Sequence, residues 1–274
     1  MADFGPHAGD SRSSFGLLQA TPHVTAHTKG SWATQTGVTP DRTDGFYLEP
    51  TYFGANSTIR TVLVDIGFGS GPTTLISNLM VCPPNANYTT TQRCIGQHAF
   101  FPVSMPPGEV MKARAQSNLA SHEDVYLWVM EVSSGLPCVG SVVDTYGADT
   151  ANSKGTTLTA STTEGTFGSW VELTSSCERI KALMIAVGHG QADWSTYGNQ
   201  YIAIKLAVGA AASETELLRI QDVGSSSGTG IASQNWLGPY YFDIPPGTRI
   251  SASVAKQYSS SSQRTVDVIL YGIR

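Results

Sequence analysis

Short runs in which apolar and polar residues alternate recur along most of the chain, and clusters of Gly, Pro, Ser and Thr separate them. In a typical run, Val62, Val64 and Ile66 share one side of an extended chain, while Thr61 and Asp65 fall on the other. Because consecutive strand residues point to opposite faces, this period of two predicts a strand with one apolar face. The same criterion predicts strands at 58–66, 75–81, 110–117, 125–132, 201–208, 216–223, 249–256 and 265–273.

Almost no segment has the period of a helix. The exception is 178–187, whose apolar residues recur at helical spacing, but a strand over 182–187 is an equally good interpretation. The pattern of the whole chain therefore predicts an all-β fold.

A motif of two aromatic residues, a short apolar run and Pro-Pro-Gly occurs twice, at 100–108 and 240–247. Proline lacks the N–H that a central strand needs, so Pro-Pro-Gly predicts a tight turn whose glycine takes a positive φ. Four further blocks recur in the same order at offsets of 138 to 142 residues: Gly30-Ser31-Trp32 with Gly168-Ser169-Trp170, 61–67 with 203–209, 75–81 with 217–223, and 125–129 with 266–270. A period of this length is that of a domain, so we expect one fold written twice.

We predict two tandem jelly-roll-like antiparallel β-sandwich domains related by internal duplication, with about seven or eight short strands each. An immunoglobulin-like sandwich is the alternative, because a strand count does not fix the topology. The expected parts are an N-terminal arm at 1–15, unit one at 16–143, a linker at 144–154 and unit two at 155–274. The linker has no long flexible tract, so we expect the units to sit at a fixed angle.

The composition narrows the partners. Only 14% of the 274 residues are charged, the formal net charge is −5, and no run of Lys or Arg exists, so neither nucleic acid nor an anionic membrane is an expected partner. No apolar run is long enough to span a membrane, and the N-terminus does not resemble a signal peptide. A surface rich in Ser and Thr without an export signal suits a virion protein that is assembled in the host cytoplasm and released by lysis.

The chain shows no recognisable catalytic or metal-binding constellation. Cys82 and Cys94 bracket a loop and could pair if oxidised, although idle thiols are the better interpretation. His23 and His27 would lie about 13 Å apart on an extended segment, too far to share a metal ion. No Gly-x-Ser-x-Gly elbow exists, and no spacing selects a pair of carboxylates. We therefore predict no catalytic residue, no cofactor and no metal, and we expect that the protein is not an enzyme.

Aromatic residues in unit two are the remaining candidates for a site. Trp194, Tyr197, Trp236 and Tyr240 fall close together in this part of the chain. Such residues fill protein–protein interfaces and also stack on sugars, so we expect an interface, with glycan stacking as the alternative.

The blocks 168–173, 204–209 and 241–250, together with their counterparts in unit one, resemble tailed-bacteriophage structural proteins of the fibre, spike or head-decoration kind. Unit one departs from the pattern after its turn, where Glu109-Val110-Met111 replaces Thr248-Arg249-Ile250. The resemblance implies a non-enzymatic virion component, a homo-oligomer in contact with itself and with other virion proteins. The alternative is a glycan-binding module that adheres to a host cell surface.

Overall fold

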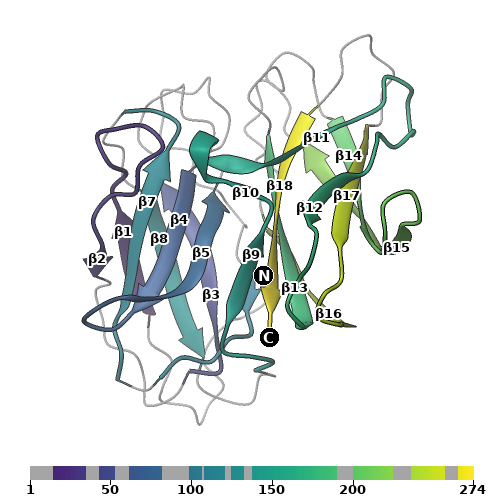
Figure 1. Ribbon diagram of the computed structural model, residues 1–274. Helices are drawn as coiled ribbons and strands as arrows, with labels where there is room; N and C mark the ends of the chain where they lie inside the picture. Colours follow the sequence, from purple (N-terminus) through teal and green to yellow (C-terminus); the bar gives the residue numbers. More distant parts are fainter. Residues whose placement is uncertain are drawn as a thin grey trace, which may run out of the picture.

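The computed structural model describes residues 15–34, 43–52, 62–81, 99–106, 108–120, 125–132, 138–189, 200–224, 236–256 and 265–274 (Figure 1). Among these residues the one helical element is the 3₁₀-helix η1 (Thr150–Asn152), and no helix has the length and apolar character of a membrane span. All other elements are strands, so the predicted all-β fold is confirmed.

Unit one comprises the strands β1 (Phe15–Ala20), β2 (Ala33–Thr34), β3 (Gly45–Tyr52), β4 (Val62–Phe68), β5 (Thr73–Val81), β6 (Ala99–Phe101), β7 (Met111–Ser117) and β8 (Val125–Val132). Unit two comprises β9 (Val143–Tyr146), β10 (Ala148–Asp149), β11 (Lys154–Thr159), β12 (Val171–Thr174), β13 (Ile180–His189), β14 (Gln200–Val208), β15 (Thr215–Gly224), β16 (Trp236–Ile244), β17 (Ile250–Lys256) and β18 (Thr265–Ile273).

Each unit is a jelly-roll-like sandwich of two antiparallel sheets. The first sheet of unit one has the order β1-β8-β3-β6 and the second has the order β2-β7-β4-β5. In unit two the corresponding orders are β11-β18-β13-β16 and β12-β17-β14-β15, with β10 and β9 added to the first sheet. The immunoglobulin-like alternative is therefore excluded. Adding ten to each strand number of unit one gives the order in unit two, which is what a duplication predicts, and the duplication itself stays a prediction.

The repeated Pro-Pro-Gly motif forms the turn that the sequence indicated. Gly108 and Gly247 adopt φ values of +73° and +80°. This left-handed region is easily reached only without a Cβ, which explains glycine at both positions. Segment 178–187, which the sequence left open between helix and strand, lies in strand β13.

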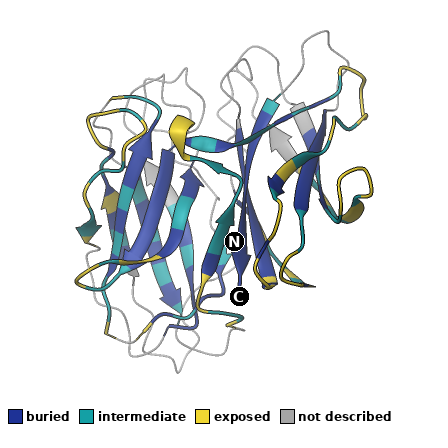
Figure 2. Cartoon of the chain, in the orientation of Figure 1, coloured by how far each residue is buried: buried dark blue, intermediate teal, exposed yellow. Residues whose placement is uncertain are grey.

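The outer surface of unit one is closed on one side by unit two. The core of unit one includes Ile269, Tyr271 and Ile273 of β18, all fully buried, so one apolar cluster runs through both units. Figure 2 shows this central strand in dark blue along most of its length. Since an apolar cluster of this kind is disrupted when the units separate, we expect them to unfold together.

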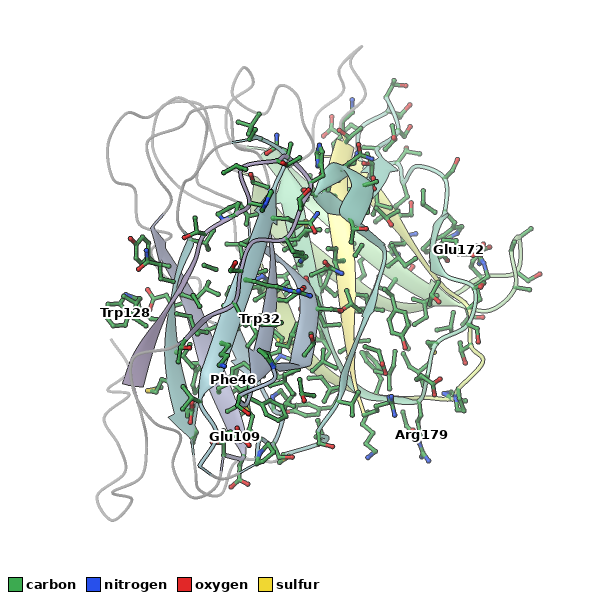
Figure 3. All side chains as sticks on the ribbon, turned by 60° about the vertical axis from the view of Figure 1, so that its left-hand side comes forward. Trp32, Phe46, Glu109, Trp128, Glu172 and Arg179 are labelled. Atoms are coloured by element: carbon green, nitrogen blue, oxygen red, sulfur yellow. The ribbon has the colours of Figure 1, made fainter. Side chains whose placement is uncertain are left out.

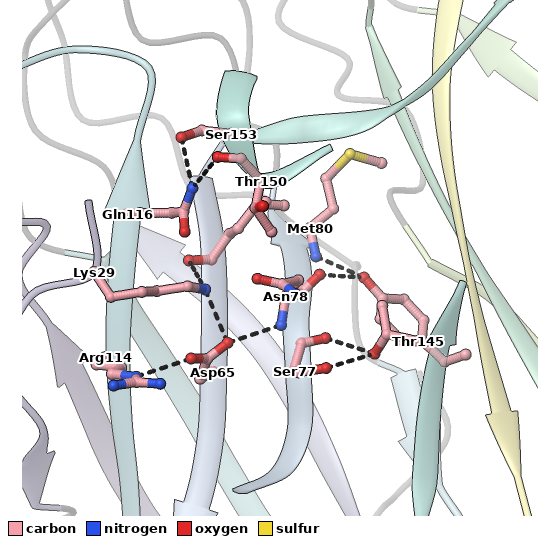
Figure 4. A network of polar contacts seen from close by, with 12 residues as sticks. Lys29, Asp65, Ser77, Asn78, Met80, Arg114, Gln116, Thr145, Thr150 and Ser153 are labelled. Carbon is pink, nitrogen blue, oxygen red and sulfur yellow. Dashed lines mark hydrogen bonds and ion pairs between the residues drawn. The ribbon is translucent and has the colours of Figure 1, made fainter. Parts of the chain in front are cut away.

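Side chains of unit two also satisfy the free edge of β5. The hydroxyl of Tyr271 accepts a 2.7 Å hydrogen bond from the N–H of Met80 and donates a 2.9 Å bond to the carbonyl of Asn78 (Figure 4). The indole N–H of Trp236 donates to the carbonyl of Met80 at 2.8 Å. These bonds cap an edge strand that would otherwise present unpaired backbone groups.

The segment 144–154, expected to link the units, carries β10 and η1 and most of β9, and both strands pair into the first sheet of unit two. Its 3₁₀-turn also contacts unit one, because Gln116 donates hydrogen bonds to the carbonyl of Thr150 and to the hydroxyl of Ser153. The segment thus lies against both units. The expected N-terminal arm lies outside the described residues apart from Phe15.

Candidate functional site

A Gly-Ser-Trp segment runs beside the second sheet of each unit, and glycine is required in both places. The N–H of Gly168 donates to the carbonyl of Val254 on β17, and a Cβ at Gly168 would overlap the carbonyl oxygen of Thr159. In unit one, a Cβ at Gly30 would overlap the carbonyl oxygen of Thr21 in the same way. The repeated motif therefore reflects a close approach of two backbone segments.

Beside this segment in unit two lies a hollow of about 540 Å³, between the end of β11 and the start of β12. Its lining consists of Thr159, Ala160, Ser161, Phe167, Gly168, Ser169 and Val171. Three hydroxyl side chains and one aromatic ring thus share the hollow. Its volume falls within the range of about 300–1,000 Å³ that is usual for small-molecule sites.

Charged side chains lie against the aromatic rings of this segment. The ammonium of Lys205 on β14 lies 3.9 Å from the ring centre of Phe167 and 5.8 Å from that of Trp170. The guanidinium of Arg219 on β15 lies 5.4 Å from the Phe167 ring. Both cations also pair with Glu216, at 3.5 Å from Lys205 and 2.9 Å from Arg219. The ring of Phe167 is thus fixed by cations and also borders the hollow.

The carboxylate of Glu216 is held in its ionised form. Two hydrogen bonds of 2.9 Å from Arg219 are the main cause that lowers the pKa of Glu216, and Lys205 lowers it further. The same bonds raise the pKa of Arg219. This rim therefore offers a fixed arrangement of hydrogen-bond donors and acceptors at neutral pH, and Glu216 is poorly suited to donate a proton.

A second network lies on the same sheet at its far end. Arg249 on β17 bridges Glu172, at 2.7 Å, and Glu214, at 3.2 Å. Figure 3 places Glu172 on the side of unit two that faces away from unit one. These ion pairs are partly exposed and tie β12 to β17 and the β14–β15 turn, so we assign them a structural role.

Unit one places different chemistry at the equivalent position, 138 residues earlier. There Lys29 stands where unit two has Phe167, and its ammonium pairs with the buried Asp65 at 2.8 Å. Asp65 also accepts bonds from Arg114 and from the backbone N–H of Asn78 (Figure 4). Burial lowers the pKa of Lys29, and Asp65 counteracts this. An internal ion-pair network therefore occupies the place that is an aromatic-lined hollow in unit two.

The predicted aromatic site is only partly described by the structure. Trp194 and Tyr197 lie outside the described residues. Trp236 is 6% exposed and bonds to Met80 across the junction of the units, so burial corrects the expectation that it stacks on a glycan or contacts another chain. Tyr240 is half-buried against the core of unit two. These residues do not form a common exposed site.

The other motifs have ordinary structural explanations. His23 caps its own turn by accepting the N–H of Thr25, while His27 contacts Ser153 of unit two at 3.0 Å, and the two histidines share no ligand. Gly69 lies in the β4–β5 turn with a φ of +89°, as a hairpin requires. In the described part of the chain, no group of three or more His, Cys, Asp or Glu residues could hold a metal ion. Cys82 and Cys94 lie outside it.

Sequence reasoning missed Phe167, Lys205, Glu216 and Arg219. The available signal was the Gly-Ser-Trp repeat, which we interpreted as placing each tryptophan at one end of the core. Instead, Trp170 is half-exposed beside Lys205, and Trp32 lies under the guanidinium of Arg114 at 4.7 Å. Comparing the residues next to the motif in the two units would have revealed the exchange of a lysine for a phenylalanine.

Comparison with known proteins gives no family: no family model and no curated protein matches the chain. Two solved structures show a distant likeness. PNGF-II is 10% identical with a TM-score of 0.39, over 97% of this chain and 66% of that one, so this chain spans just under two thirds of its length. PNGase F, a glycosylasparaginase from Flavobacterium meningosepticum, is 14% identical with a TM-score of 0.36, over 97% of this chain and 91% of that one.

These comparisons contradict the function expected from the sequence. The solved chains include a glycosylasparaginase and no virion component, so the prediction of a non-enzymatic bacteriophage structural protein is wrong and is not pursued. PNGase F is an enzyme, whereas we expected none. With TM-scores below 0.5, neither the activity nor any residue of these proteins is transferred to this chain.

Proposed function

We propose that unit two binds a saccharide in the hollow beside Phe167. The observation that supports this proposal is the lining of the hollow, which combines one aromatic ring with the hydroxyl groups of Thr159, Ser161 and Ser169. A sugar ring has an apolar face of C–H groups and a periphery of hydroxyls, so it needs both kinds of partner at once.

The rim of the hollow extends the same chemistry. Glu216 and Arg219 are joined by two hydrogen bonds of 2.9 Å, which fixes an acceptor and a donor side by side. Neighbouring hydroxyls of a saccharide can bond to such a pair without a change in its charge state. Lys205, which packs on the Phe167 ring at 3.9 Å, restricts the motion of that ring and so reduces the entropy lost on binding.

The proposal concerns binding. Cleavage of a glycosidic bond needs a carboxylic acid that can donate a proton, and the lowered pKa of Glu216 keeps this carboxylate ionised. Within the hollow itself the lining residues are aromatic, hydroxyl-bearing or small, and none carries a carboxylate.

A panel of neutral and acidic oligosaccharides, followed by isothermal titration of the best ligand, tests the proposal. Phe167→Ala should weaken binding about tenfold, which corresponds to about 1.4 kcal/mol. Ser169→Ala should weaken it less, about fivefold, since one hydrogen bond contributes about 1 kcal/mol. Mass spectrometry of the saccharide after incubation shows whether it is also cleaved.

Unit one supplies the matched control. Ser31 is the counterpart of Ser169 in the repeated motif, and next to it Lys29 replaces Phe167. Ser31→Ala should therefore leave the binding constant unchanged. The proposal fails if no saccharide of the panel binds, or if binding is the same in the wild type, Phe167→Ala and Ser169→Ala.

A further inference from the structure

The two units of one chain meet through unlike surfaces. Unit one contributes the edge formed by β5 and β6, and unit two contributes the outer face of its first sheet. On that face, Ile269, Tyr271 and Ile273 are fully buried and belong to the core cluster of unit one. The contact inside the chain is therefore an edge packed on a sheet face.

Unit one has the same kind of face at its own first sheet. β8 is the counterpart of β18, and the repeat offset of 141 residues places Trp128 and Met130 where unit two has Ile269 and Tyr271. Along β8, buried and half-exposed residues alternate strictly, and Trp128 and Met130 are among the half-exposed ones. Figure 3 shows Trp128 on the side of the molecule that faces away from unit two.

Neighbouring strands continue this surface, which we call the β8 face. In the strand register Trp128 lies next to Leu17 on β1, and Met130 lies next to Tyr47 on β3. Tyr47 in turn lies beside Phe100 on β6, with ring centres 4.9 Å apart. Half-exposed aromatic and apolar side chains from four adjacent strands thus form one continuous surface, of the kind that marks an interaction site.

Unit two has the complementary edge. β15 and β16 are the edge strands that correspond to β5 and β6, but no third unit of the chain packs on them. Ile76 and Leu79 of β5 are fully buried, whereas Leu217 and Leu218 of β15 are only partly buried. Tyr241 on β16 is 53% exposed. One end of the chain therefore presents a face and the other presents an edge.

We propose that the β8 face binds the β15–β16 edge of a second copy of this chain. The contact would repeat between chains the packing that already joins the two units within one chain, which is why we name a second copy as the occupant. Such a contact is head-to-tail, so each copy uses one surface for each neighbour. Repetition closes a ring if the rotation between copies permits it, and otherwise extends a filament. The proposal is independent of saccharide binding.

Sedimentation velocity on the full chain over a wide concentration range tests this. The wild type should associate, and one charge placed on either surface should stop it: Trp128→Glu on the face, or Tyr241→Glu on the edge. Each change should weaken self-association at least about tenfold. Val24→Glu, at an exposed position in the β1–β2 connection, is the control and should associate like the wild type. Circular dichroism checks folding, and Met130→Lys replaces Trp128→Glu if that variant does not fold.

Mixing the two variants gives the decisive result. Trp128→Glu keeps an intact edge and Tyr241→Glu keeps an intact face, so an equimolar mixture should form a dimer and stop there, while each variant alone stays a monomer. The proposal is overturned if the wild type is a monomer at every concentration. It is also overturned if association survives both changes, or if the mixture of folded variants does not dimerise.

Discussion

Removing the hydroxyl of Tyr271 tests how the two units are held together. The side chain is fully buried, and its oxygen accepts the N–H of Met80 at 2.7 Å while donating to the carbonyl of Asn78 at 2.9 Å. Tyr271→Phe keeps the ring in the shared core and removes both bonds. The edge strand β5 then loses a partner for one donor and one acceptor in a place that water does not reach.

The structure sets the size of the effect. A buried polar group left without a partner costs about 1–3 kcal/mol. Two such groups, offset in part because the phenol no longer has to be desolvated, give an expected loss of about 2–4 kcal/mol. For a cooperative unit of this size each kcal/mol corresponds to about 2–4 °C, so the melting temperature should fall by about 5–10 °C.

Urea unfolding and calorimetry measure this loss, and Tyr146→Phe is the control. The hydroxyl of Tyr146 accepts the N–H of Glu178 at 2.9 Å in an exposed setting, where water can replace it. The control should therefore cost less than about 1 kcal/mol. The reasoning is refuted if Tyr271→Phe lies within about 0.5 kcal/mol of the wild type, or if the wild type unfolds in two separate transitions, since the shared core requires one.

Three further changes test other parts of the structure. Gly168→Ala should cost about 2 kcal/mol because its Cβ meets a backbone carbonyl, whereas Gly71→Ala, with open space around it, should be neutral; urea unfolding compares them. Lys29→Met leaves the buried Asp65 with fewer partners and should cost about 1–3 kcal/mol, and an unchanged melting temperature would contradict this. Burial raises the pKa of Asp267, so its charged form lowers stability above that pKa and the penalty disappears as the pH falls toward the unfolded value. Asp267→Asn should therefore stabilise the protein at about pH 8 and not at about pH 4, in melting curves across that range; the same gain at both ends would count against it.

The strands were accessible from the sequence because local pattern determines them. The expected ranges 125–132 and 265–273 coincide with β8 and β18, and 75–81 falls within β5. Alternation within a strand depends only on which face meets the core, and the same core faces recur in both units. The positive φ of Gly247 followed from Pro-Pro-Gly for an equally local reason.

The surroundings of the individual side chains were not accessible, because they depend on contacts between distant segments. Trp236 was expected at an exposed site, yet it is buried against Met80, 156 residues away in the chain. Nothing in its sequence neighbourhood distinguishes an aromatic residue that faces another chain from one that faces the other unit. The same holds for Trp32 and Trp170, whose positions follow from the cations that a neighbouring strand places beneath them.

Where the two units differ is therefore more informative than where they agree. Positions that build the sandwich, such as Gly30 and Gly168, are retained because both copies need the same backbone approach. Next to that motif, Lys29 and Phe167 have diverged, and the first completes an internal ion pair while the second borders an open hollow. Once the backbone is satisfied in each unit, the side chains beside it are free to differ, and a hollow retained in one unit alone marks the place where a ligand is the most economical explanation for the difference.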